Sequence, residues 1–96
     1  MQRPTQMTLL DLLSDLHKQV VERIQRDDQL DLKYLSHTLA ELEEAAARLG
    51  DHEVGFVFND MGNAVNDVLY GVPEKVEFSM AEIERRLAII AARSKP

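Results

Sequence analysis

The amino-acid sequence predicts an all-α protein that folds as an antiparallel four-helix bundle. Apolar residues recur every three or four positions in four separate segments, which is the spacing of one face of an α-helix. Leu, Ala, Glu and Arg are abundant, whereas the 96 residues include three Phe, two Tyr and no Trp, a composition that favours helix over sheet. We therefore expect a single domain, residues 1–96, flexible at residues 1–6 and 94–96, with helices at about residues 8–27, 31–49, 52–70 and 79–93.

The first predicted helix begins at Thr8, a residue type that caps helix amino termini. Met7 and Leu12 stand at the two positions of a hydrophobic staple around this cap. The apolar stripe that follows is Leu9, Leu13, Leu16, Val20 and Ile24. We expect the helix to end in the acidic segment that begins at Asp27.

The second predicted helix carries the clearest periodicity in the chain. Asp31 is its expected cap, and Leu30 and Leu35 are the expected staple. Gly50 supplies the left-handed residue that commonly ends a helix. Between these ends runs a heptad seam of Leu32, Leu35, Leu39, Leu42, Ala46 and Leu49.

The third predicted helix begins near Asp51 and stops at Gly71 and Pro73. Its several β-branched residues and two internal glycines lower its helix propensity, so a strand at residues 54–58 is the alternative. The apolar stripe of this helix is Val54, Val57, Met61, Val65 and Val68.

The fourth predicted helix follows a connection at residues 71–78. Ser79 and Glu82 have the spacing of a capping box, and Phe78 and Ile83 that of a staple. Short connections favour antiparallel neighbours, although a three-helix core that lends its fourth helix to a partner is also open. A chain this small without cysteines commonly gains stability by association, so we expect a homodimer. The inner face of the fourth helix is Met80, Ile83, Leu87 and Ile90.

The charge of the chain is unevenly distributed. The formal net charge is −6, but residues 27–84 carry fourteen acids and three bases, while the two ends together carry three acids and eight bases. No Lys or Arg lies between Arg48 and Lys75, which disfavours nucleic-acid binding by the third helix. No run of about 18 apolar residues is present, and the amino terminus lacks a signal-peptide pattern, so we expect no membrane partner and a cytoplasmic location.

One histidine stands in a context that suggests chemistry. The sequence Ser36-His37-Thr38-Leu39 resembles the phospho-acceptor segment of histidine phosphotransfer domains, in which an exposed mid-helix His is followed by Leu, Lys and Gly. This resemblance of four residues implies His37 as an alternative phospho-acceptor. The Lys and Gly of that pattern are absent, and Glu41 lies one helical turn away, where its charge would repel a phosphoryl group.

The remaining polar residues do not form a recognised catalytic or metal-binding pattern. No Glu-x-x-His pair is present, and residues 27–31 lack the glycine and terminal glutamate of a calcium loop. No serine stands in a nucleophile elbow, His17 falls at the edge of the first apolar stripe, and His52 falls in the first turn of the third helix. We therefore expect a non-enzymatic protein without a cofactor or metal ion.

The third helix also carries a stripe of small and polar residues. Each internal glycine costs about 1 kcal/mol relative to Ala, so two on one face call for a reason. One interpretation is close docking of a partner helix or a second copy; the others are internal packing or a solvent-facing polar stripe. The favoured hypothesis is a regulatory or adaptor protein that binds another protein through this stripe and the acidic surface. The alternatives are a phosphotransfer domain that uses His37 and a structural scaffold. The predicted partner-binding residues are Gly55, Asn59, Gly62, Asn63, Asn66 and Asp67.

Overall fold

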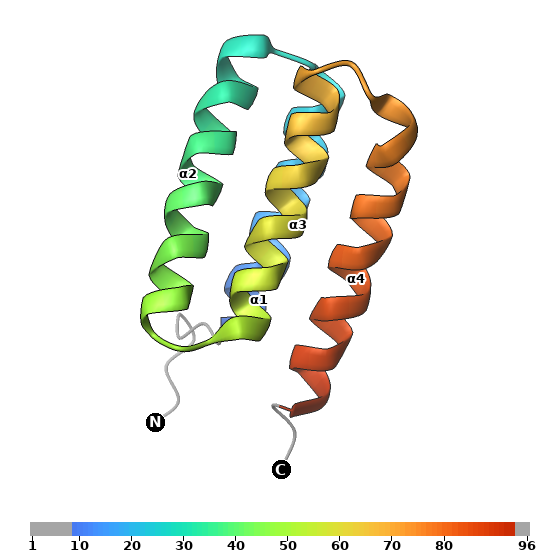
Figure 1. Ribbon diagram of the computed structural model, residues 1–96. Helices are drawn as coiled ribbons and strands as arrows, with labels where there is room; N and C mark the ends of the chain where they lie inside the picture. Colours follow the sequence, from blue (N-terminus) through green and yellow to red (C-terminus); the bar gives the residue numbers. More distant parts are fainter. Residues whose placement is uncertain (1–8, 94–96) are drawn as a thin grey trace, which may run out of the picture.

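The computed structural model describes residues 9–93, which form four antiparallel helices (Figure 1). They are α1 (Leu9–Arg26), α2 (Gln29–Arg48), α3 (His52–Leu69) and α4 (Val76–Arg93), with a 3-10 turn, η1 (Pro73–Lys75), before α4. The predicted all-α fold is confirmed, and residues 54–58 are helical rather than extended. The predicted cap at Thr8, the staple that uses Met7, and the ends at residues 1–6 and 94–96 lie outside the described residues.

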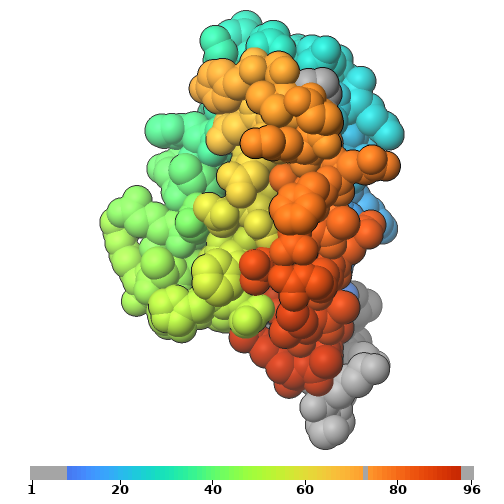
Figure 2. All heavy atoms as spheres, turned by 45° about the vertical axis from the view of Figure 1, so that its right-hand side comes forward, coloured from blue at the N-terminus to red at the C-terminus, as the bar shows by residue number. Residues whose placement is uncertain are grey.

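The four helices do not pack equivalently, because α3 occupies the centre of the arrangement. The backbones of α2 and α4 approach α3 closely along its length, whereas α1 approaches the other helices closely at few points. In Figure 1, α2 and α4 flank α3 while α1 lies behind it. In Figure 2, α3 is visible as a narrow yellow band between green α2 and orange-to-red α4. One face of α3 is therefore left exposed between its two neighbours.

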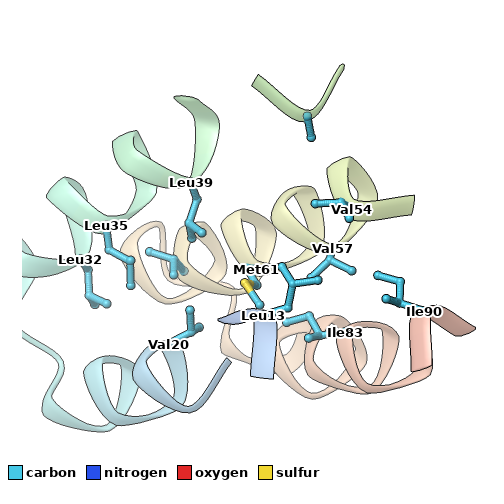
Figure 3. Packing of buried hydrophobic residues seen from close by; sticks show 12 residues of the cluster. Leu13, Val20, Leu32, Leu35, Leu39, Val54, Val57, Met61, Ile83 and Ile90 are labelled. Atoms are coloured by element: carbon cyan, nitrogen blue, oxygen red, sulfur yellow. The ribbon is translucent and has the colours of Figure 1, made fainter. Parts of the chain in front are cut away.

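All four helices contribute to one hydrophobic core (Figure 3). The seams predicted from spacing supply most of it, because residues three and four apart share one helical face. The burial of Ile83 and Ile90 places α4 inside this core, so the alternative of a lent fourth helix is wrong for this chain. The largest fully buried side chains are Leu13, Val20, Leu32, Leu39, Val57, Met61, Val65, Ile83 and Ile90.

Glycine ends two of the helices as the sequence predicts. Gly50 and Gly71 have φ of 76° and 75°, a left-handed conformation that a Cβ disfavours. After α2 the amide of Asp51 donates to the carbonyl of Ala46, and after α3 the amide of Val72 donates to that of Asp67. Each bond joins an amide to the carbonyl five residues earlier, as in the Schellman motif, which satisfies carbonyls at the helix end.

Two predicted caps are wrong. Helix α2 begins at Gln29, and its cap is Asp28, whose carboxylate accepts from the amides of Leu30 and Asp31. The preceding Asp27 takes a φ of 53°, which turns the chain sharply enough for α2 to start two residues before the predicted position. Leu30 is consequently inside the helix and 80% exposed, so it does not form the predicted staple.

The predicted capping box of α4 is also wrong. Helix α4 starts at Val76, directly after η1, and the connection from α3 is shorter than residues 71–78. Ser79 is therefore within the helix, and its hydroxyl donates to Asp67 of α3 at 3.3 Å instead of capping. Phe78 is mostly exposed rather than part of a staple.

Helix α2 shows one further departure from the sequence-based prediction: Leu49, the last residue of the predicted seam, is 85% exposed.

Candidate functional site

At one end of the interface between α2 and α3, small residues allow the two backbones to approach closely. A Cβ placed on Gly55 would lie 3.7 Å from the Cβ of Ala46 and 4.0 Å from the carbonyl oxygen of Glu43. Gly55 is buried at this contact. The first residue of the predicted partner-binding stripe therefore serves packing within the chain.

Polar side chains of the same stripe connect α3 to α2. The hydroxyl of Ser36 donates to Asn66 Oδ1 at 2.7 Å in a part-buried position. Nearer the other end, Asn59 Nδ2 lies 3.3 Å from both carboxylate oxygens of Glu43, and Asn63 donates to Asn59 at 3.3 Å. Asn66 and Asn59 thus bridge the two helices, Asn59 at the exposed surface, whereas Asn63 binds Asn59 within α3.

A row of shallow hollows runs along this interface, and we call it the α2–α3 groove. The upper hollow has a volume of about 330 Å³ and is lined by Lys33, Ser36, His37, Ala40, Leu69 and Tyr70. The middle hollow, of about 90 Å³, shares Ser36 and Ala40 with it and adds Glu43, Phe58, Asn59, Gly62, Asn63 and Asn66. The lower hollow, also of about 90 Å³, is lined by Glu43, Ala47, Asp51, His52, Gly55 and Phe56.

Gly62 differs from Gly55 because no internal contact requires it. A Cβ added at Gly62 would meet no atom within 4 Å, although the residue lines the middle hollow. Its backbone conformation is helical, which any residue can adopt. The glycine therefore leaves open space on the surface of the groove.

Asp67, the remaining predicted residue, faces α4 rather than the groove. Its carboxylate accepts the hydrogen bond from Ser79 in a part-buried position. Asp60, two helical turns before Asp67 on the same side of α3, also binds α4: Nε of Arg86 lies 2.6 Å from its carboxylate. Arg86 also places its guanidinium 4.7 Å from the centre of the Phe56 ring, a cation–π contact that fixes this ring at the lower end of the groove.

The ends of the groove contain residues that the sequence analysis did not single out. Tyr70 is mostly exposed beside the upper hollow, and Phe56 is about half exposed beside the lower one. At the lower end, hydrogen bonding from Arg93 lowers the pKa of Asp51 below its ordinary value of 3.8. The sequence does not show that Phe56 and Tyr70 border the same groove, because this depends on how α2 and α3 pack.

His37 is exposed on α2 and lines the upper hollow. Its Nε2 lies 3.9 Å from a carboxylate oxygen of Glu41. This acid stands where a phosphoryl group on His37 would be, so its charge opposes that product. Phosphotransfer by His37 stays a prediction.

Residues 9–93 also lack two kinds of feature. Within them, no three His, Asp or Glu side chains come together as a metal-ion site. In the same range, no helix combines the length and the apolar character needed to cross a membrane.

Comparison with known proteins does not identify a relative: no family model, no curated protein and no solved structure matches this chain significantly.

Proposed function

We propose that this protein is a non-enzymatic regulatory or adaptor protein that binds a helical segment of another protein in the α2–α3 groove. The groove follows α2 from Lys33 to Ala47, which at the helical rise of 1.5 Å per residue is about 20 Å. That length accommodates roughly four turns of a partner helix. Recognition of a helix in a groove between two helices is a common mode of peptide binding.

The observation that carries the proposal is the open space at Gly62. An internal glycine destabilises a helix by about 1 kcal/mol relative to Ala, and here no packing contact offsets that cost. Close approach of a second backbone from outside would supply the missing reason, because only a residue without a side chain leaves room for it. Gly62 lies at the middle of the groove, where a bound helix would come nearest.

The chemistry of the groove suggests what its partner presents. Small residues such as Ala40 and Gly62 form the surface, and Tyr70 and Phe56 stand at the two ends. Exposed aromatic residues are enriched among the residues that dominate binding energy at interfaces. A partner helix with small residues along its centre and apolar side chains near its ends would match this arrangement.

The charge near the middle of the groove favours a basic partner. Glu43 lines both the middle and the lower hollow, and Glu41 is an exposed neighbour on α2. Carboxylates at such positions attract Lys and Arg of a partner and raise the association rate, an effect that salt screens. The association rate of the complex should therefore fall as salt is added.

The test compares Gly62→Ala and Gly62→Leu with the unmodified chain. Both substitutions should leave the melting temperature unchanged or raise it, because they improve helix propensity in open space, by about 0.5–1 kcal/mol for Ala. Gly62→Leu should nevertheless lower capture of the partner from the source cell at least tenfold, as quantified by mass spectrometry of the bound proteins.

Ala88→Leu is the matched control, because Ala88 is an exposed helical residue on α4 outside the groove. It should leave capture of the same protein unchanged. Equal capture by Gly62→Leu and Ala88→Leu would exclude the groove as the binding surface. A large loss of stability in Gly62→Ala would show instead that this glycine serves internal packing.

A further inference from the structure

A fourth hollow lies on a different face of α2, beside Leu9 at the start of α1. It has a volume of about 310 Å³ and lies where the first turn of α1 and the last turns of α2 leave part of α3 uncovered. Its lining is almost entirely apolar, which distinguishes it from the polar α2–α3 groove. The residues that line it are Leu9, Leu42, Ala45, Ala46, Leu49, Asp51, Val54 and Phe58.

Two exposed leucines line this hollow, and a third lies on the neighbouring turn of α1. Leu49 is 85% exposed at its rim although it belongs to the heptad seam of α2. Leu9 lines the hollow and is nearly half exposed, and Leu12, one turn further along the same face of α1, is about half exposed. A concentration of exposed leucine around an apolar hollow is typical of a surface that is covered by another molecule.

We propose that a second copy of this chain covers the surface, with Leu49 of each copy inserted into the hollow of the other. A two-fold symmetric dimer requires a surface that is complementary to itself, since each contact occurs twice. This surface offers both halves of such a contact side by side: a protruding leucine and a hollow larger than one leucine side chain.

The charges near the hollow are consistent with self-association of an acidic chain. The net charge of −6 opposes association of two copies wherever unpaired acids would face one another. At the hollow, however, the lining acid Asp51 is bound by Arg93 at 3.1 Å. This ion pair is neutral in sum, so the acid in the lining of one copy would not face the other copy unpaired.

Residues 1–8 are the competing occupant, since they join the chain at Leu9 on the rim of the hollow. Met1 and Met7 are the only large apolar residues among these eight. Ordering the backbone of such a segment is costly, and two methionine side chains offer little burial in return. A second copy brings a surface that is already folded, so it is the better occupant.

The proposal has a consequence for the α2–α3 groove without depending on it. The hollow uses Leu42, Ala45 and Leu49, whereas the groove uses Ala40, Glu43 and Ala47 on another face of α2; Asp51 and Phe58 line both. A dimer formed through the hollow would leave the surface around Gly62 open in each copy and present two binding sites to a partner. The Gly62→Leu substitution should therefore leave the mass of the dimer unchanged, which separates the two proposals experimentally.

The test is the mass of the complete chain, measured by sedimentation equilibrium from about 1 μM to about 1 mM. The unmodified chain should have the mass of two copies at the higher concentrations, and Leu49→Glu should raise the dissociation constant at least tenfold. Leu30→Glu is the matched control, because Leu30 is 80% exposed at the opposite end of α2 and lines none of the hollows described above. It should change the dissociation constant less than twofold.

A cross-link identifies the surface directly, because the sequence contains no cysteine. When single-cysteine chains carrying Leu49→Cys and Ala45→Cys are mixed and oxidised, they should join to each other in preference to joining like with like. Circular dichroism establishes that each variant is folded.

Three outcomes overturn the proposal. The first is a monomer across the whole concentration range, and the second is a dimer that survives Leu49→Glu. The third is a dimer that forms only after residues 1–8 are deleted, which would assign the hollow to that segment instead.

Discussion

The α2–α3 interface and the contacts of α1 are built from different side chains. Between α2 and α3, Gly55 meets Ala46 closely, and Ser36 donates to Asn66 across the interface. Helix α1 contributes the buried Leu13 and Val20 to the core but approaches the other backbones closely at few points. Small residues allow backbones to come together and polar side chains to bridge them, whereas leucine keeps helices further apart.

This difference indicates that α3 is the structural centre of the protein and α1 its most separable helix. The described bridges from α3 reach both of its neighbours: Asn66 and Asn59 bind α2, while Asp60 and Asp67 bind α4. An ion pair of α1 with α2, between Arg23 and Asp31, spans 3.8 Å. Helices with fewer close contacts open at lower free energy, so the amides of α1 should exchange with solvent before those of α3.

The largest expected effect comes from the centre of α3. Met61 is fully buried, and Met61→Ala should lower the free energy of unfolding by about 2–5 kcal/mol, because it removes buried surface and leaves a cavity. The matched change on α1 is Leu16→Ala, at a half-buried position. It should lower the free energy of unfolding by no more than about 2 kcal/mol. Urea denaturation measures both, and equal losses would contradict the central role of α3.

The next effect concerns the start of α3. Asp51 caps this helix by accepting from the amide of Val54 and also binds Arg93 of α4. Asp51→Ala should destabilise the protein by about 1–2 kcal/mol, whereas Asp51→Asn keeps a capping side chain and should cost a few tenths of a kcal/mol, the contribution of a surface ion pair. Thermal denaturation of the two variants at pH 7 separates the cap from the charge.

The stabilisation from the ion pair between Asp51 and Arg93 should also depend on pH. Because hydrogen bonding from Arg93 lowers the pKa of Asp51 in the folded protein below 3.8, the stabilisation is complete at neutral pH and is lost as the pH falls through that lowered pKa. The stability of Asp51→Asn should therefore converge with that of the unmodified chain once the pH falls below this lowered pKa. A difference that stays constant between neutral and acid pH would exclude the ion pair as its cause.

The smallest effects are expected from two polar contacts: the hydrogen bond between Ser36 and Asn66 of α3, and the ion pair between Arg23 of α1 and Asp31. Ser36→Ala leaves the part-buried Oδ1 of Asn66 without its donor and should cost about 1 kcal/mol. Arg23→Gln breaks a long, partly exposed ion pair and should cost at most about 0.5 kcal/mol. If Arg23→Gln cost more than Ser36→Ala in urea denaturation, α1 would be held by polar contacts more firmly than the structure indicates.

The candidate site was predictable from the sequence only in part. The spacing of Gly55, Asn59, Gly62 and Asn66 placed them correctly on one face of a helix. Spacing did not show that this face meets α2, that Gly55 is buried while Gly62 faces open space, or that Asp67 points to α4. Those outcomes depend on which helix lies opposite each residue, and residues on different helices do not reveal their pairing through periodicity.

The sequence by itself determined the four helices, most of their core residues and the glycines that end two of them. These features are set by neighbours within one or two turns, through hydrophobic spacing, helix propensity and the left-handed conformation of Gly50 and Gly71. Only the tertiary structure decided that Ser79 binds Asp67 instead of capping α4, and that Leu49 lies outside the core its seam predicts. A polar or terminal side chain takes the partner that packing places beside it, and that choice is made between helices rather than within one.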